Sequence, residues 1–256
     1  HVRYSTAGAS FAANAQPIVI KYKNGNLALA HNGSLVNADY LRGQLEDQGM
    51  IFSTTTDTEV IAALIAKNYK GDIIEAIKSM MDIIKGSYAL TILTDNKLIG
   101  VRDGFGIRPL VLGKLENGYV LASESCALDT VGAQFVRDVR PGEIVVIDKD
   151  EMKSIDHITN LPKKLCLFEH IYFARPDSII DGVSMYKARE NAGRILAKEQ
   201  PAIADTVLSV PDSGTPAAIG YANESGIPYS IGLIKNRYVG RTFIQPTQSM
   251  RELGVK

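Results

Sequence analysis

The sequence lacks several features that would place it in a familiar class of proteins. It has no tryptophan, only two cysteines in 256 residues, and equal numbers of basic and acidic residues, 28 of each. Two distant cysteines exclude the dense disulfide framework of a small secreted domain, so we expect a reducing compartment, the cytoplasm. Balanced charge gives no basic field for nucleic acid, and no apolar run approaches the roughly 20 residues that cross a bilayer. Any binding partner must therefore be recognised by a local site rather than by the overall charge of the protein.

The length and the 45% hydrophobic content predict a globular protein with one large core or two modest ones. The chain opens directly inside a motif, without an initiating methionine, and ends abruptly at Gly254-Val255-Lys256. We therefore expect natural segments to be missing at both ends.

Residues 1–148 are predicted to form a first domain. Asn24-Gly25 separates two short β-rich runs, at 17–22 and 27–31, and predicts a hairpin because Asn and Gly tolerate the positive φ values of a tight turn. Helices are expected to follow and to cover one face of a sheet, at 37–48, from Thr58, and at 73–84. Further strands are expected to form a second antiparallel sheet packed on the first, at 87–93, 98–102, 110–112, 119–122 and 143–147.

The remaining chain predicts a linker and a second domain. Residues 149–165 are rich in charge and contain Pro162, which indicates an edge segment and linker. Residues 166–256 are expected to hold a strand, a helix, a strand and a helix in that order, at 167–173, at 184–199, at 206–210 and after Gly214. This order predicts the beginning of an α/β sheet.

Three positions could together bind glutamine. An enzyme that hydrolyses its amide needs a cation for the α-carboxylate, an anion for the α-ammonium group and donors for the oxyanion, and Arg3, Asp57 and Asn32-Gly33 could fill these roles in turn. Each residue taken alone fits a surface arginine, a helix cap or a turn equally well.

The motifs in combination resemble the N-terminal-nucleophile glutamine amidotransferase family. They are HVRYSTAG at 1–8, AHNGS at 30–34, TTDTE at 55–59, GFGIRPL at 104–110 and ASES at 122–125. The resemblance implies a four-layer α/β/β/α sandwich.

It also implies roles for single residues. Arg3, Tyr4, Thr6 and Asp57 would hold glutamine, and Asn32 and Gly33 would form the oxyanion hole. The family's nucleophile is an N-terminal cysteine, whereas this chain begins with His1. Cys126 and Cys166 both stand in apolar surroundings that indicate buried side chains. The four histidines show no zinc-ligand spacing.

The second module resembles the amidophosphoribosyltransferase family, through FEHIYFARPDS at 168–178, SMYKAR at 184–189, VPDSG at 210–214 and KNRYVGRTF at 235–243. The resemblance implies a phosphoribosyltransferase-like α/β domain, incomplete here, and transfer of glutamine-derived ammonia to C1 of phosphoribosyl pyrophosphate in purine synthesis. Ser213 would bind Mg²⁺, and Cys166 would be one ligand of a [4Fe-4S] cluster in the intact protein. A loop over the phosphoribosyl site would carry Lys235, Arg237 and Arg241.

The resemblance further implies purine nucleotide inhibitors and a homo-oligomer, a dimer or a tetramer. The family's acidic phosphoribosyl-binding signature is not found, so we expect it beyond Lys256 and expect the 256 residues alone to be inactive. Three alternatives stay open: a plain solvated basic loop at 235–241, an amidotransferase that aminates a sugar phosphate, and a glutamine- or nucleotide-binding module without catalysis.

Overall fold

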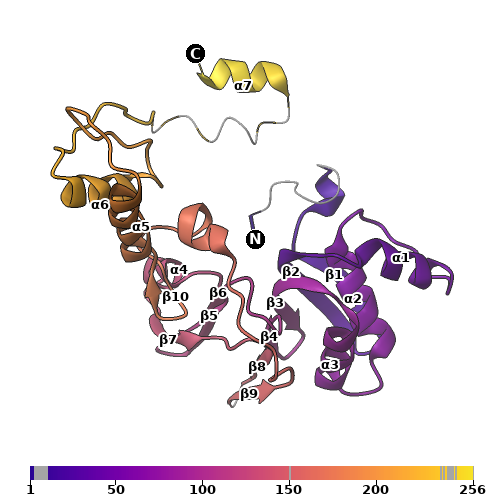
Figure 1. Ribbon diagram of the computed structural model, residues 1–256. Helices are drawn as coiled ribbons and strands as arrows, with labels where there is room; N and C mark the ends of the chain where they lie inside the picture. Colours follow the sequence, from indigo (N-terminus) through magenta and orange to yellow (C-terminus); the bar gives the residue numbers. More distant parts are fainter. Residues whose placement is uncertain are drawn as a thin grey trace. The chain divides into compact units, whose positions relative to one another are not determined.

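The computed structural model describes residues 1–2, 11–149, 151–236, 238, 240, 245 and 247–255. The chain divides into two compact units, His1–Cys166 and Leu167–Lys256, whose elements are labelled in Figure 1. None of the helices in the described ranges is both long and apolar enough to cross a membrane.

A six-stranded antiparallel sheet forms the centre of the first unit. Its order is β1-β2-β3-β4-β8-β9. The bounds are β1 Ile18–Tyr22, β2 Gly25–Leu35, β3 Gly86–Thr94, β4 Leu98–Arg102, β8 Glu143–Ile147 and β9 Met152–Asp156. The predicted hairpin is confirmed, since Tyr22 pairs with Gly25 at the end of the β1–β2 ladder. A short 3₁₀ helix, η1 (Ala12–Asn14), precedes β1.

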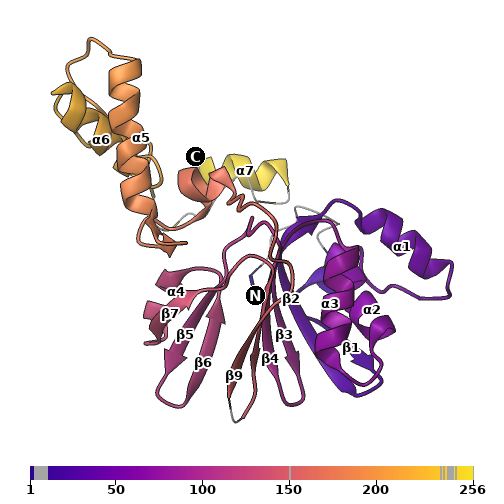
Figure 2. The same cartoon turned by 60° about the horizontal axis from the view of Figure 1, so that its bottom comes forward.

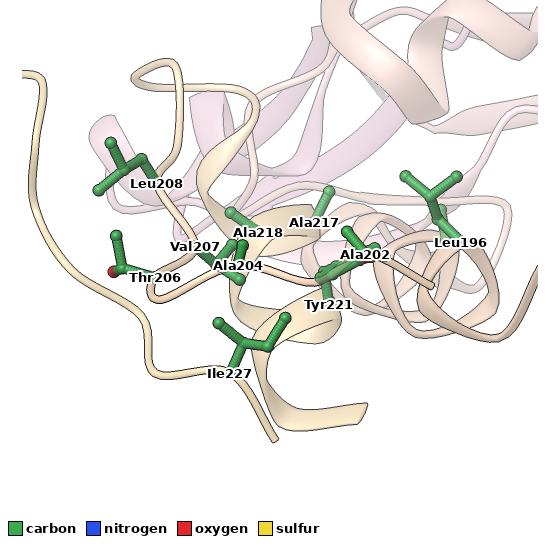
Figure 3. Close-up of a pocket in the computed structure, with 12 residues that line it drawn as sticks. Leu196, Ala202, Ala204, Thr206, Val207, Leu208, Ala217, Ala218, Tyr221 and Ile227 are labelled. Carbon is green, nitrogen blue, oxygen red and sulfur yellow. The ribbon is translucent and has the colours of Figure 1, made fainter. Parts of the chain in front are cut away.

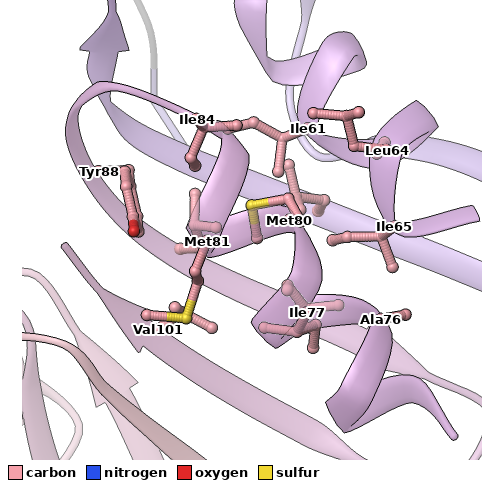
Figure 4. Packing of buried hydrophobic residues seen from close by; sticks show 14 of the residues in the cluster. Ile61, Leu64, Ile65, Ala76, Ile77, Met80, Met81, Ile84, Tyr88 and Val101 are labelled. Carbon is pink, nitrogen blue, oxygen red and sulfur yellow. The ribbon is translucent and has the colours of Figure 1, made fainter. Parts of the chain in front are cut away.

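Three helices cover one face of this sheet, as the sequence predicted: α1 (Ala38–Glu46), α2 (Asp57–Asn68) and α3 (Ile73–Ile83) (Figure 2). Alternate strand residues such as Leu29, Leu90 and Ile99 are fully buried in the core beneath them. Figure 4 shows the helix side of this core, where Ile61 and Ile65 of α2 pack with Ile77 and Met80 of α3. Burial of these faces supplies the main stabilisation of the unit.

A three-stranded sheet, in the order β6-β5-β7, packs on the opposite face of the first. Its strands are β5 Val111–Leu115, β6 Gly118–Ala122 and β7 Gln134–Asp138, and α4 (Ser125–Thr130) lies outside it. Leu112 joins the core between the sheets with Val145 of β8, whereas its neighbour Val111 packs against Leu128 of α4. Successive strand residues thus face different layers, and the unit has the expected four-layer α/β/β/α order.

The division of strands between the two sheets differs from the prediction. Residues 87–93, 98–102 and 143–147 were expected in the second sheet but belong to the first, as β3, β4 and β8. These strands are buried on both faces, so their apolar pattern does not reveal which layer they join. The sequence also missed β7, which is mostly exposed, and β9 falls inside the segment 149–165.

The second unit is mainly helical in its described residues. It contains a π-helix, η2 (Glu169–Phe173), the short strands β10 (Ile179–Ile180) and β11 (Val183–Ser184), and the helices α5 (Met185–Glu199), α6 (Thr215–Ser225) and α7 (Gln248–Val255). The two predicted helices are confirmed as α5 and α6. They pack closely through glycines: a Cβ on Gly193 would lie 1.8 Å from the carbonyl oxygen of Ala217.

Two predicted strands of this unit are wrong. Residues 167–173 are helical instead and include η2, Glu169–Phe173, where Arg189 of α5 donates to the carbonyl oxygens of His170 and Ala174, at 2.6 and 2.7 Å, and favours a helical turn. Residues 206–210 contribute only one parallel bridge, between Val207 and Tyr229.

Candidate functional site

A pocket of about 150 Å³ lies between the two sheets of the first unit. Asn32 of β2 lines it, together with Ser123, which follows β6. Residues of four of the motifs, at 1–8, 30–34, 104–110 and 122–125, therefore meet at one place. The other lining residues are His1, Ala30, Ala89, Thr91, Leu110, Leu121 and Ala122.

Gly33 follows Asn32 and occupies a position that only glycine fits. It has φ +153°, and a Cβ there would lie 2.1 Å from the carbonyl oxygen of Ser87 and 2.7 Å from Nε2 of His31. No shift of a flexible side chain can relieve contact with a backbone oxygen on the paired strand β3. The strand pairing therefore requires the Asn-Gly dipeptide that the sequence marked.

Asp57, the first residue of α2, lies against the same part of β2. Its Oδ2 accepts the backbone N–H of Leu35 at 2.9 Å, and its Oδ1 is 3.7 Å from Nδ1 of His31. Burial raises the pKa of the Asp57 carboxyl, but His31 and the N–H groups of Leu35 and Thr58 together hold that pKa below its ordinary value. A carboxylate in this state can accept a cation.

Asp57 and Asn32 lie on opposite faces of β2. Asp57 lies on the side of His31 and Leu35, beneath the helices, while Asn32 faces the second sheet. The two side chains lie beside the same segment of β2. Of the two, only Asn32 lines the pocket between the sheets.

The sequence did not reveal the side chains that hold Asp57 in place. The amide of Asn14 pairs with Thr55, two residues before Asp57, through contacts of 2.9 and 3.0 Å. The amide of Gln16 contacts Thr58, the residue after Asp57, and the backbone of His31. The residues in contact are 15 to 42 positions apart in the sequence. No local sequence pattern therefore predicts these contacts.

The GFGIRPL motif forms a turn that two buried side chains hold. Arg102 is fully buried and donates to the carbonyl oxygens of Gly106, Arg108 and Val139. The Asp103 carboxylate accepts backbone N–H groups of this turn. Burial raises the pKa of Asp103, although the N–H groups around it lower that pKa in part. The buried contacts of Arg102 and Asp103 thus fix this turn, and the last residue of the motif, Leu110, lines the pocket between the sheets.

Arg3, Tyr4, Thr6, Arg237 and Arg241, five of the predicted site residues, lie outside the described residues.

The other predicted residues of the second unit lie close to one another. Lys235 places Nζ 3.0 Å from Oδ2 of Asp212, and Ser213 follows in the turn that leads into α6. The structure thus joins Lys235 to Asp212, two residues from motifs that the sequence marked separately.

A second pocket, of about 430 Å³, lies beside α5 and α6 (Figure 3). Its lining is almost entirely aliphatic, with Leu196 from α5, Ala217 and Ala218 from α6, and Val207 and Leu208 from the segment between them. Such a lining does not suit a diphosphate, and neither Ser213 nor Lys235 belongs to it.

The residues fit Mg²⁺ but not an iron–sulfur cluster. Mg²⁺ is commonly held by few protein groups together with water and substrate phosphates, so the hydroxyl of Ser213 suits the ion, and the start of α6 beside it suits the phosphates. A cluster requires about four thiolates. The chain has two cysteines, Cys126, buried in α4, and the half-buried Cys166, and in the described part no three His, Cys, Asp or Glu side chains form a metal-binding group.

Comparisons with known proteins show what the chain is similar to. The model of the glutamine amidotransferase domain family matches residues 1–130. The amidophosphoribosyltransferases of Archaeoglobus fulgidus and Bacillus subtilis are 54% and 51% identical to the chain, over all of it and over 56% and 54% of their own lengths.

A solved structure of the B. subtilis glutamine phosphoribosylpyrophosphate amidotransferase, complexed with ADP and GMP, has a TM-score of 0.89 and 50% identity. All of this chain matches that structure, and the match covers 56% of the solved chain. The chain thus spans about half the length of the relatives it matches. It belongs to the glutamine amidotransferase domain family.

Proposed function

We propose that the protein containing these residues is a glutamine-dependent pentosyltransferase of purine synthesis. It would transfer ammonia from glutamine to C1 of 5-phosphoribosyl 1-pyrophosphate and release phosphoribosylamine, pyrophosphate and glutamate. The observation that carries the proposal is that relatives with this name align with both units, over the whole chain and at about half identity. A sugar-phosphate amidotransferase would share the first unit alone.

In the first unit, the proposed reaction is hydrolysis of the glutamine amide. The side chain of Asn32 and the backbone N–H of Gly33 would stabilise the oxyanion, since both belong to the segment beside the inter-sheet pocket. Asp57 would accept the α-ammonium group, and Arg3, with Tyr4 and Thr6, would bind the α-carboxylate. The attacking group would be an N-terminal cysteine, so the 256 residues alone should release no glutamate.

In the second unit, the proposed reaction is displacement of pyrophosphate. Ser213 would hold Mg²⁺ with the diphosphate, and the ion supplies positive charge that stabilises the leaving group. Lys235, Arg237 and Arg241 would contact phosphate oxygens. For Lys235 this requires exchanging its ion pair with Asp212 for the substrate.

The same relationship supports several further proposals. A relative was solved with ADP and GMP, so we include purine nucleotides among the inhibitors, together with a homo-oligomeric state and a cytoplasmic location. Cys166 would serve as a cluster ligand only with cysteines beyond the two in this sequence.

The test uses the product of the complete reading frame, with pyrophosphate release measured once with glutamine and once with ammonium chloride. Asn32→Ala should lower glutamine-dependent turnover about 100-fold to 1,000-fold, the effect of removing one oxyanion donor, and should spare the ammonium-dependent rate. Asn26→Ala, at an exposed position of β2, is the matched control. Absence of pyrophosphate with either nitrogen source would reject the transferase proposal and favour a binding module.

A further inference from the structure

Three hydroxyl groups of the second unit meet at the turn that contains Ser213. Oγ of Ser209 lies 3.2 Å from Oγ1 of Thr215 and 2.9 Å from the phenolic oxygen of Tyr229. Ser209 is only 8% exposed, so its hydroxyl needs partners within the protein, and the other two hydroxyls supply them. Each of the three groups can both donate and accept, so the cluster forms whichever way its protons point.

The contact between Ser209 and Thr215 joins the two ends of a short loop. Ser209 precedes residues 210–214, and Thr215 begins α6 directly after them. Inside the loop, the backbone N–H of Thr215 reaches the carbonyl oxygen of Asp212 at 3.3 Å, which is long for a hydrogen bond. Val210 is 73% exposed, and the side chain of Asp212 is 70% exposed. The conformation of the loop therefore depends on how its ends are held.

Tyr229 attaches the first end of this loop to another segment of the chain. The backbone N–H of Val207 donates to the carbonyl oxygen of Pro228, and the backbone N–H of Ser230 donates to the carbonyl oxygen of Val207, both at 2.9 Å. Tyr229 thus forms a parallel bridge with Val207, two residues before Ser209. Since the backbone on either side of Tyr229 is fixed by this pairing, its hydroxyl limits the movement of Ser209.

We propose that Tyr229 is a positioning residue for the phosphoribosyl pyrophosphate site. Through Ser209 and Thr215 it holds the loop 210–214 in the conformation that presents the hydroxyl of Ser213 to the Mg²⁺–diphosphate. The inference rests on the role proposed above for Ser213. None of the three residues of the hydroxyl cluster belongs to a motif that the sequence marked.

The proposal predicts which kinetic constant changes. A loop that is already ordered in the free protein loses less conformational freedom when the substrate binds. Without the cluster, part of the binding energy of the Mg²⁺–diphosphate would go into ordering the loop, whereas the saturated complex would keep the same geometry. Loss of the cluster should therefore raise KM for phosphoribosyl pyrophosphate about threefold to tenfold, the contribution of one neutral hydrogen bond, and leave kcat nearly unchanged.

Four single variants and one double variant separate the hydroxyls from the rest of the side chains. Tyr229→Phe removes the phenolic oxygen and keeps the ring, and Ser209→Ala removes the central hydroxyl. The double variant tests whether the two act through one contact. Thr215→Ser keeps its hydroxyl and should behave as the unchanged protein. Tyr221→Phe is the matched control, because it removes a phenolic oxygen of α6 that donates to the carbonyl oxygen of Gln200 at 2.8 Å.

The first readout is amide hydrogen exchange of residues 212–218 in the product of the complete reading frame, without ligand. In this segment the N–H groups of Thr215 and Ala218 donate to the carbonyl oxygens of Asp212 and Gly214. We expect faster exchange in Tyr229→Phe and Ser209→Ala, and unchanged exchange in Thr215→Ser and Tyr221→Phe. Unchanged exchange in Tyr229→Phe would overturn the proposal, because the loop would then be held without it.

The second readout is pyrophosphate release by the same product with ammonium chloride as the nitrogen source, at saturating Mg²⁺. Tyr229→Phe and Ser209→Ala should raise KM for phosphoribosyl pyrophosphate about threefold to tenfold and leave kcat within about twofold. The double variant should be no worse than Ser209→Ala alone. Faster exchange with an unchanged KM, or additive effects in the double variant, would overturn the proposal.

Failure of the proposed function gives a different result. An unchanged protein that releases no pyrophosphate with either nitrogen source would reject that function, and with it the role of Tyr229, whatever the exchange shows. An active unchanged protein whose KM is the same in Tyr229→Phe would reject the role of Tyr229 alone.

Discussion

Glu143 offers the sharpest test of what stabilises the first unit. It is fully buried at the start of β8, and its carboxylate accepts two N–H groups of Arg137, at 2.8 and 2.6 Å, and the backbone N–H of Arg140 at 2.7 Å. The hydroxyl of Ser154 on β9 donates to it as well. Glu143→Gln keeps the volume but turns an NH₂ group towards donors. Breaking a buried pair costs about 3–5 kcal/mol, and because Arg137 is 29% exposed we expect a loss of about 2–3 kcal/mol.

The loss should depend on pH in a definite direction. Burial raises the pKa of Glu143, but Arg137, Ser154 and the Arg140 N–H outweigh that effect and hold the pKa below its ordinary value. A carboxyl whose pKa is lower folded than unfolded stabilises the protein above its unfolded pKa of about 4.3 and loses that contribution as the pH falls through the folded pKa. The difference between the two proteins should therefore shrink between pH 7 and about pH 3.

Hydrogen exchange of the β8 amides measures both effects, since it reports the opening free energy of this unit apart from the other. Glu46→Gln, at the exposed end of α1, is the matched control. A loss at pH 7 below about 1 kcal/mol, within the range of an exposed ion pair, would refute the reasoning. So would a difference that is as large at pH 3 as at pH 7.

Two glycine substitutions test the close backbone contacts. Gly33→Ala places a Cβ 2.1 Å from the carbonyl oxygen of Ser87, so the complete product should lose glutaminase activity more than about 100-fold, as for a lost oxyanion donor; activity within threefold would contradict the proposed role. Gly220→Ala places a Cβ 2.0 Å from the carbonyl oxygen of Glu190 and should separate α6 from α5, which faster amide exchange in both helices would report; unchanged exchange would contradict it. Gly43→Ala, with no atom within 4 Å of the new Cβ, is the control for both and should be neutral or slightly stabilising.

The elements that the sequence predicted correctly are those with local causes. In α2 the four apolar residues at helical spacing, Val60, Ile61, Leu64 and Ile65, are buried as predicted, although the burial extends round the helix to every residue from Thr58 to Ile65. Ser184 accepts the backbone N–H of Lys187 and begins α5 as an N-cap. In both cases the determining residues lie within one or two turns of each other.

The elements that the sequence predicted wrongly have distant causes. η2 reads as an apolar strand until Arg189, which lies 15 residues or more away, binds its carbonyl oxygens. β3 and β8 read as strands, but only their neighbours β2 and β4 decide the sheet to which they belong. A periodic pattern specifies which faces are buried and leaves open what buries them.

The TTDTE motif shows the same limit at the proposed site. Its members have separate tasks in the structure: Thr55 pairs with Asn14, Glu59 accepts the backbone N–H groups of Ser53 and Thr54, and the Asp57 carboxylate lies beside His31. A motif read from sequence combines a residue that could bind substrate with residues that fix its position. Gln16 has the second kind of task and lies outside every motif that the sequence marked. Residues that hold a motif in place are therefore found from the structure, because only the folded chain shows which donor faces which acceptor.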